Sequence, residues 1–154
     1  MTSQTTPKFS VVTVERQFTA VVKAMVPFAG IPQAQRSARA TIDAGLPSLD
    51  AGTVGLACTR WVPPQGGALA MEMGSIVSRP IAASGEIVPS ELPAGRAAHY
   101  LMVGPFDGMG TAWQQLFEWI QAEKLKPAGI NWEIYGPAPA DPARQETHLY
   151  ALLA

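Results

Sequence analysis

Val26-Pro-Phe-Ala-Gly-Ile31 is repeated later in the chain as Gly104-Pro-Phe-Asp-Gly-Met109. In each copy an apolar stretch precedes the motif, and a helical pattern follows it. A later glycine, Gly52 or Gly129, then precedes two more strand-like runs. Self-similarity of this kind is typical of a duplicated supersecondary unit. The sequence therefore predicts two copies of a strand–helix–strand–strand unit, over about residues 9–75 and 95–154.

The first copy extends in both directions from its motif. Residues 10–26 are rich in Val, Thr and Phe, which predicts one long strand with a bulge near Arg16. Apolar residues at helical spacing between Ile31 and Ile42 predict a helix that Gly45 ends. The two strands that follow are predicted at residues 53–62 and 68–73, separated by a Pro/Gly-rich turn at 63–67.

The second copy repeats this order after a linker at about residues 76–94, in which 85–88 are expected to form a short strand or an extended piece. A strand is predicted at 96–103, Asp107 is the predicted N-cap, and further strands are predicted at 131–136 and 145–153. The helical stripe of this copy contains Met109, Trp113, Leu116, Phe117 and Ile120, all expected in the core. We expect an α+β fold in which two helices cover one face of a largely antiparallel sheet, with a ligand cleft between the halves.

Composition limits the class of protein. The 154 residues fit a single domain, and the charged fraction of 15% lies below the roughly 25% usual for a soluble domain. The apolar surface that this implies suits a ligand or a partner chain, including a second copy. A net charge of -1 with scattered Lys and Arg argues against direct nucleic-acid binding. A polar N-terminus, one cysteine (Cys58) and no apolar run of about 20 residues predict a cytoplasmic protein without membrane contact.

Three segments of the second copy resemble the GyrI-like, or bacterial effector-binding, domain family, which includes the ligand-binding halves of AraC-type and MerR-type activators. These segments are Gly104-Pro-Phe-Asp-Gly-Met109, Ala112-Trp-Gln-Gln-Leu-Phe-Glu-Trp-Ile120 and Pro127-Ala-Gly-Ile-Asn-Trp-Glu-Ile-Tyr135. The resemblance is close from residue 96 onward and looser over 11–73. It implies a single domain of two modules with a cleft between them. It also implies an aromatic pocket around one buried acid, which in relatives binds bulky hydrophobic and often cationic compounds.

Glu133 stands at the position of that acid. On a strand, Glu133 and Tyr135 share one side, while Trp132 and Ile134 share the other. If Trp132 and Ile134 pack beneath the helix, Glu133 and Tyr135 face the open side. A carboxylate among aromatic rings attracts a delocalised cation, and desolvation raises its pKa. The alternative is a solvated carboxylate paired with a nearby Lys or Arg.

The other ligand-binding candidates are aromatic or methionine side chains: Tyr135, Tyr100, Trp61, Met71, Met73 and Phe106. Aromatic rings offer π-faces to a flat cation, and methionines offer adaptable apolar walls. The alternative for each of them is ordinary packing in the sheet or the core. The sequence contains no spacing typical of a metal site, a phosphate-binding loop or a nucleophile elbow, so we expect no metal or cofactor.

Three functions are consistent with these patterns. The first is a stand-alone protein that binds a hydrophobic small molecule, which can be a cation. The second, implied by some stand-alone relatives, is a hydrolase of cyclopropane-containing genotoxins in which Glu133 is the catalytic acid or base. The third is an interaction module that inhibits DNA gyrase. The low charge favours a lined pocket over a charged inhibitory surface, and we expect no DNA-binding domain of the kind that the activators carry.

Overall fold

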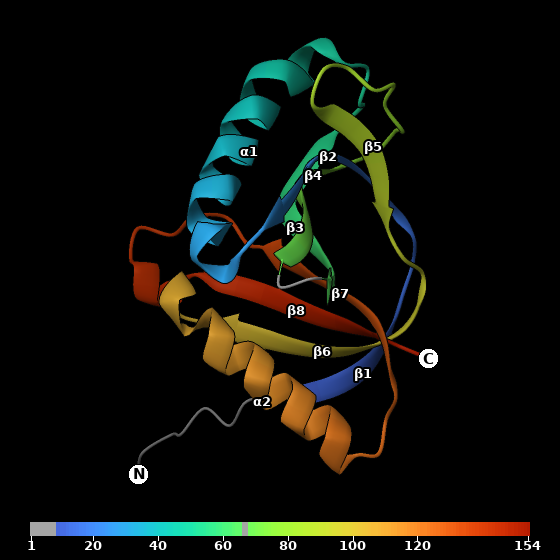
Figure 1. The fold of residues 1–154 in the computed structure, drawn as a ribbon, viewed down its shortest axis with the longest axis vertical. Helices are drawn as coiled ribbons and strands as arrows, with labels where there is room; N and C mark the ends of the chain where they lie inside the picture. The colour runs from blue at the N-terminus through green and yellow to red at the C-terminus, as the bar shows by residue number, and fades with distance from the viewer. Residues whose placement is uncertain (1–8, 66–67) are drawn as a thin grey trace.

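The computed structural model describes residues 9–65 and 68–154, and within them it forms one eight-stranded antiparallel sheet with two α-helices (Figure 1). The strands are β1 (Phe9–Val14), β2 (Gln17–Val26), β3 (Val54–Gln65), β4 (Ala68–Val77), β5 (Ile87–Leu92), β6 (Gly95–Val103), β7 (Pro127–Tyr135) and β8 (Glu146–Leu153). The helices are α1 (Ile31–Gly45) and α2 (Met109–Ala122). The predicted α+β fold with a repeated strand–helix pattern is confirmed. Two residues of the predicted turn, Gly66 and Gly67, and the polar N-terminal segment lie outside the described residues.

The sheet is arranged as two related halves. Its strand order is β1-β6-β8-β7-β3-β4-β2-β5. Replacing each strand by its counterpart in the other copy gives the same order read from the opposite edge. The first half contains β2, β3 and β4, the second contains β6, β7 and β8, and β3 pairs with β7 where they meet. Each copy gives its leading strand to the other half, since β1 pairs with β6 and β5 pairs with β2. The duplication therefore includes an exchange of edge strands.

This exchange corrects the prediction of one long strand over residues 10–26. Glu15 and Arg16 separate β1 from β2, and the two strands run to opposite parts of the sheet. The prediction was wrong because strand propensity is high on both sides of this charged pair, and propensity does not reveal the pairing partner. The predicted linker likewise contains a strand of the sheet, β5. Pro89 is compatible with β5 because β5 lies at an edge.

The repeated motif forms the same local structure in both copies. A 3-10 turn at Phe28–Gly30 precedes α1, and another at Phe106–Gly108 precedes α2. The backbone N–H of each final glycine donates to the carbonyl of the motif's proline, over 2.9 Å in the first copy and 3.1 Å in the second. The predicted N-cap Asp107 is therefore wrong. The turn moves the helix start to Met109 and leaves Gly108, without a side-chain cap, at the cap position.

The two helices pack over different halves of the sheet (Figure 1). Ile42 of α1 packs against residues of β2, β4 and β5, and Leu116 of α2 packs against residues of β6 and β8. The face away from the helices has its own core, in which Leu92 of β5 and Ala97 of β6 share one cluster with Trp132. Strands from near opposite edges meet there because the sheet curls on itself. In the described part of the chain, neither helix is long and apolar enough to cross a membrane.

Candidate ligand-binding site

Glu133 lies in the middle of the face that carries the helices. Its direct cross-strand neighbours are Thr59 on β3 and Leu149 on β8, and its side chain is 2% exposed. The expectation that Trp132 and Ile134 pack beneath a helix was wrong, because both fill the core of the curled face instead. Glu133 and Tyr135 still share one side of β7. That side is the one between the helices.

A cavity of about 890 Å³ lies over Glu133. Its walls come from both halves, with α1, β3 and β4 on one side and α2 and β7 on the other. The predicted residues that line it are Glu133, Tyr135, Trp61, Met73 and Phe106. Small-molecule sites are mostly apolar clefts of about 300–1,000 Å³ with a few polar groups, and this cavity fits that description.

Two of the predicted residues lie elsewhere. Tyr100 shares a cross-strand row with Glu133 through Leu149, but its ring packs against Phe9, 4.8 Å between centroids, in the core beneath α2. Met71 is 1% exposed and packs with α1 in the core. Strand alternation predicts the face of the sheet on which a residue lies. It does not predict how much of that face a helix covers.

The carboxylate of Glu133 accepts two short hydrogen bonds. Trp113 Nε1 on α2 donates to Oε2 and the Tyr135 hydroxyl donates to Oε1, each over 2.6 Å. The Tyr135 oxygen also lies 2.7 Å from Thr59 Oγ1 and 3.4 Å from Gln35 Nε2 on α1. A tyrosine has one hydroxyl proton, so when Tyr135 donates to Glu133, Thr59 donates to Tyr135. The network connects both helices to the centre of the sheet.

Burial dominates the electrostatics of this group. It raises the pKa of the Glu133 carboxyl, and the hydrogen bonds from Tyr135 and Trp113 only partly oppose that effect. Burial and the adjacent carboxylate likewise raise the pKa of Tyr135 well above its usual value. Among the described residues, no Lys or Arg lies at ion-pair distance from Glu133. The alternative of a solvated, paired carboxylate therefore does not describe this residue.

Aromatic rings surround the carboxylate. The Phe106 ring meets Tyr135 edge-on at 5.7 Å, and Trp113 stacks on Phe117 at the same centroid distance. The prediction that Phe117 belongs to the core was wrong, since it is 37% exposed at the cavity. Trp113 does pack against the core beneath α2, as predicted, but it also lines the cavity. A signal for Trp113 was present in the sequence, because a buried indole N–H usually requires an acceptor. Its position four residues before Phe117 places both rings on one helical face.

Two polar atoms at the cavity have no hydrogen-bond partner within the described part of the chain. They are Trp61 Nε1, a donor, and Asn131 Oδ1, an acceptor, and the two residues are cross-strand neighbours. An unsatisfied buried polar group costs about 1–3 kcal/mol. The Trp61 indole nevertheless acts on the Glu133 carboxyl, whose raised pKa it helps to lower, so this donor is oriented toward that carboxyl. Asn131 Oδ1 marks a position where a ligand or water would complete the hydrogen bonding.

A duplicated sheet domain with a ligand-sized cavity between its helices is the class of protein that this geometry defines. Residues 7–153 match the model of the GyrI-like small molecule binding domain, and the chain belongs to that family. The resemblance expected from the sequence is thereby confirmed. No curated protein matches the chain.

Several solved structures share the fold. The EcmrR C-terminal domain has a TM-score of 0.77 at 16% identity, covering 96% of this chain and 98% of that one. EcmrR in a DNA complex has a TM-score of 0.79 at 15% identity over 96% of this chain, which spans only 57% of EcmrR. SAV2435 bound to tetraphenylphosphonium has a TM-score of 0.70 at 10% identity, covering 96% and 94%. A hydrolase from Listeria innocua has a TM-score of 0.59 at 14% identity, covering 96% and 92%.

Proposed function

We propose that this protein binds a hydrophobic small molecule carrying a delocalised positive charge, with Glu133 as the counter-charge. The observation that carries the proposal is a buried carboxylate facing an apolar cavity, with no cationic side chain at ion-pair distance among the described residues. A lipophilic cation supplies the missing charge and is itself easily desolvated. The similar fold of SAV2435, which was solved with tetraphenylphosphonium bound, supports the choice of ligand class.

The aromatic walls add to this attraction. A cation placed over the face of an aromatic ring gains about 0.5–2 kcal/mol. Trp61, Trp113 and Tyr135 line the same cavity as Glu133 and are available for such contacts. Phe106 and Phe117 form an apolar mouth through which a hydrophobic ligand enters. Charge and aromatic surface therefore act on the same ligand group.

The hydrogen-bond network holds the carboxyl group in both protonation states. Ionised Glu133 accepts from Trp113 and Tyr135. Protonated on Oε1, it donates to the Tyr135 oxygen, whose own proton then turns to Thr59 Oγ1. Because a cation stabilises the ionised form, binding is expected to weaken as the pH falls through the raised pKa of Glu133.

Two ions of the same shape and opposite charge test the proposal. Tetraphenylphosphonium is expected to quench tryptophan fluorescence with saturation and to give a binding isotherm by calorimetry, while tetraphenylborate binds much more weakly. Glu133→Gln keeps the size of the side chain, and its amide can still accept from Trp113 while it donates to the Tyr135 oxygen. It should weaken phosphonium binding by at least about tenfold. The matched control is Glu86→Gln, which removes the same formal charge from an exposed residue outside the cavity. Equal affinity for the two ions, or an unaffected Glu133→Gln variant, would make the proposal wrong.

One observation favours a second candidate function. A carboxyl of raised pKa, hydrogen-bonded to a phenol, is suited to proton transfer. We propose as the alternative a hydrolase that adds water across a strained cyclopropane bond, so that one carbon gains the hydroxyl and the other the proton. Mass spectrometry would detect a product heavier by one water, formed at least about a hundredfold more slowly by Glu133→Gln. Inhibition of DNA gyrase stays a prediction, tested by supercoiling in vitro.

A further inference from the structure

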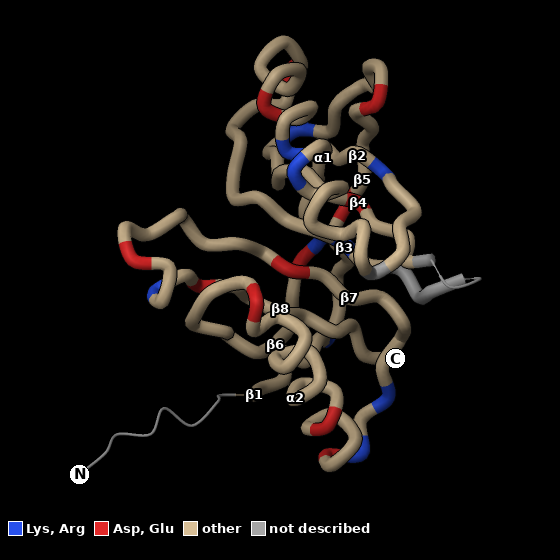
Figure 2. Tube along the Cα trace, turned by 60° about the vertical axis from the view of Figure 1, so that its left-hand side comes forward, with Lys and Arg blue, Asp and Glu red and all other residues tan. Residues whose placement is uncertain are grey.

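The charged residues that line the cavity are divided between its two walls. The basic ones, Arg36 and Arg39, are both on α1, and the acidic ones, Asp107 and Glu133, both come from the second copy. Every other described lining residue is neutral. Basic and acidic positions are otherwise interspersed along the trace, and α1 carries basic positions (Figure 2). The cavity therefore has one basic wall and one acidic wall.

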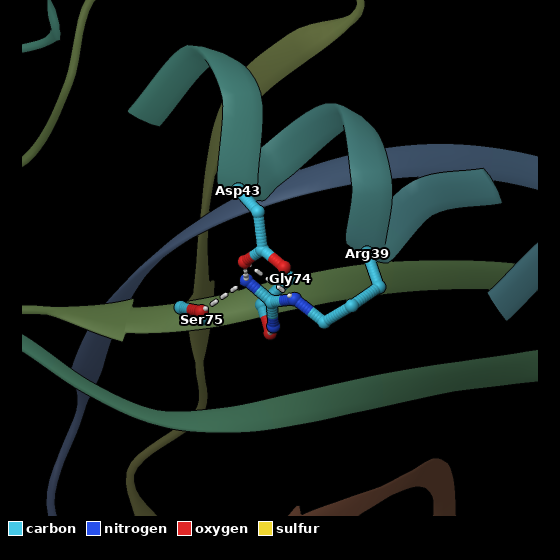
Figure 3. Close-up of polar contacts among 4 residues, drawn as sticks. All are labelled: Arg39, Asp43, Gly74 and Ser75. Carbon is cyan, nitrogen blue, oxygen red and sulfur yellow. Dashed lines mark hydrogen bonds and ion pairs between the residues drawn. The ribbon is translucent and has the colours of Figure 1, made fainter. Parts of the chain in front are cut away.

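Arg39 is fixed on the basic wall (Figure 3). Its Nε and Nη2 contact Asp43 Oδ1 at 2.9 and 2.7 Å. Nη2 also donates to Ser75 Oγ over 3.1 Å, and Nη1 donates to the carbonyl of Gly74 over 3.3 Å. Of the five guanidinium N–H groups, these contacts leave one on Nη1 free of any partner in the described chain. These contacts fix the orientation of the Arg39 guanidinium group and leave one N–H available to a ligand.

Arg36 lies one helical turn before Arg39 on the same face of α1. Its polar contact is with the side chain of Gln33, over 3.1 Å. No carboxylate within the described ranges lies at ion-pair distance from it. Arg36 therefore brings an uncompensated positive charge to the cavity. Arg36 is exposed to solvent, which screens its charge, and the charge of Arg39 is balanced by Asp43. A ligand that is only cationic therefore gains from Glu133 and gains nothing at this wall.

We propose that the preferred ligand is amphoteric, with a lipophilic cation at one end and a carboxylate or similar anion at the other. This inference rests on the proposed function, because the cation occupies the aromatic site at Glu133. The anion accepts hydrogen bonds from Arg36 and from the free Nη1 donor of Arg39. The two charges of such a ligand would lie on opposite walls, because Glu133 is on β7 whereas Arg39 is on α1 and contacts Ser75 of β4, two strands from β7 in the sheet.

Such a pair of walls selects by repulsion as well as by attraction. A simple cation is attracted by Glu133 but gains nothing from Arg36, and a simple anion is disfavoured by the carboxylate of Glu133. Only a molecule that presents both charges in the right order is attracted at both ends. The division of charge therefore determines specificity within the class of hydrophobic cations.

The test compares (5-carboxypentyl)triphenylphosphonium with its methyl ester, which has the same cation and nearly the same size but no negative charge. Wild-type protein is expected to bind the free acid more tightly than the ester by calorimetry at neutral pH. Arg36→Gln should weaken binding of the acid by about fivefold and leave the ester unchanged or tighter. The matched control is Arg79→Gln, which removes an arginine that pairs with Asp50 and does not line the cavity. It should leave the preference intact.

The outcomes separate the two proposals. If the ester binds as tightly as the acid, or if Arg36→Gln weakens both equally, the amphoteric ligand is wrong while cation binding stands. Binding of tetraphenylphosphonium without binding of either carboxypentyl compound also overturns the amphoteric ligand. If none of the phosphonium ions binds, the proposed function fails, and this inference fails with it.

Discussion

Glu133 is both the proposed binding group for a cation and a residue that destabilises the fold. Burial removes water from the carboxylate, and its pKa in the fold lies above the ordinary value that it has in the unfolded chain. A group whose pKa is raised by folding contributes stability below its unfolded pKa and loses that contribution as the pH rises through its folded pKa. At neutral pH the unfolded chain ionises this group freely whereas the fold opposes its ionisation, so the buried carboxyl lowers the free energy of unfolding relative to acid pH.

Glu133→Gln is accordingly expected to stabilise the free protein at neutral pH while it weakens cation binding. The expected gain is on the order of 1–3 kcal/mol, because removing a neutral amide from water costs less than removing a carboxylate. Thermal unfolding followed over a range of pH measures it, and the difference from wild type should close at acid pH, where Glu133 is protonated. Glu86→Gln, which alters an exposed side chain, should show no such difference. A Glu133→Gln variant that is less stable than wild type at neutral pH would contradict this reasoning.

Single residues were predictable where a local rule applies. Alternation along a strand placed Glu133 and Tyr135 on one side, and the structure has them there. Trp113 was assigned to the core because it lies on the apolar stripe of its helix. Its role as a donor to Glu133 depends on how α2 crosses the sheet, and helical periodicity does not carry that information.

Elements show the same division between local and non-local information. The repeated Pro-Phe-x-Gly motif predicted the start of α1, and that of α2 to within one residue, because it forms a local turn closed by one hydrogen bond. The exchange of β1 and β5 between the halves was not predictable from composition, since pairing partners are distant in sequence. The curled face results from that exchange. The prediction therefore placed Trp132 and Ile134 beneath a helix, whereas Glu133 and Tyr135 are the residues of β7 that face the helices.

Gly74 on β4 illustrates how closely two of these strands approach. A Cβ at this position would overlap the backbone carbonyl of Ala20 on β2, and backbone cannot move aside as a side chain can. Gly74→Ala is therefore expected to destabilise the fold by about 3 kcal/mol. Gly110→Ala is the matched change, because a Cβ there meets open space on α2 and should stabilise by about 0.5–1 kcal/mol. Denaturant unfolding measures both, and equal effects of the two substitutions would contradict the assignment.

At the scale of the whole molecule, the two halves meet through the pairing of β3 with β7 and through the network around Glu133. Gln35 of α1 and Trp113 of α2 both reach this network, from opposite sides. The cavity therefore lies where the halves join, and any ligand in it contacts both. A ligand at this position acts as an additional connection between the two copies.

Hydrogen exchange of the backbone amides tests this connection directly. A ligand that binds only the native state stabilises it by about 2.7 kcal/mol at a concentration of 100 times its Kd. We expect tetraphenylphosphonium to slow exchange in α1 and α2 together, since opening either wall releases the ligand. In Glu133→Gln, with affinity at least about tenfold lower, the same concentration should stabilise the native state by no more than about 1.4 kcal/mol, so the slowing should be clearly smaller in both helices. Slower exchange confined to one helix would show that the ligand binds within one half. The binding site would then not lie between the two copies.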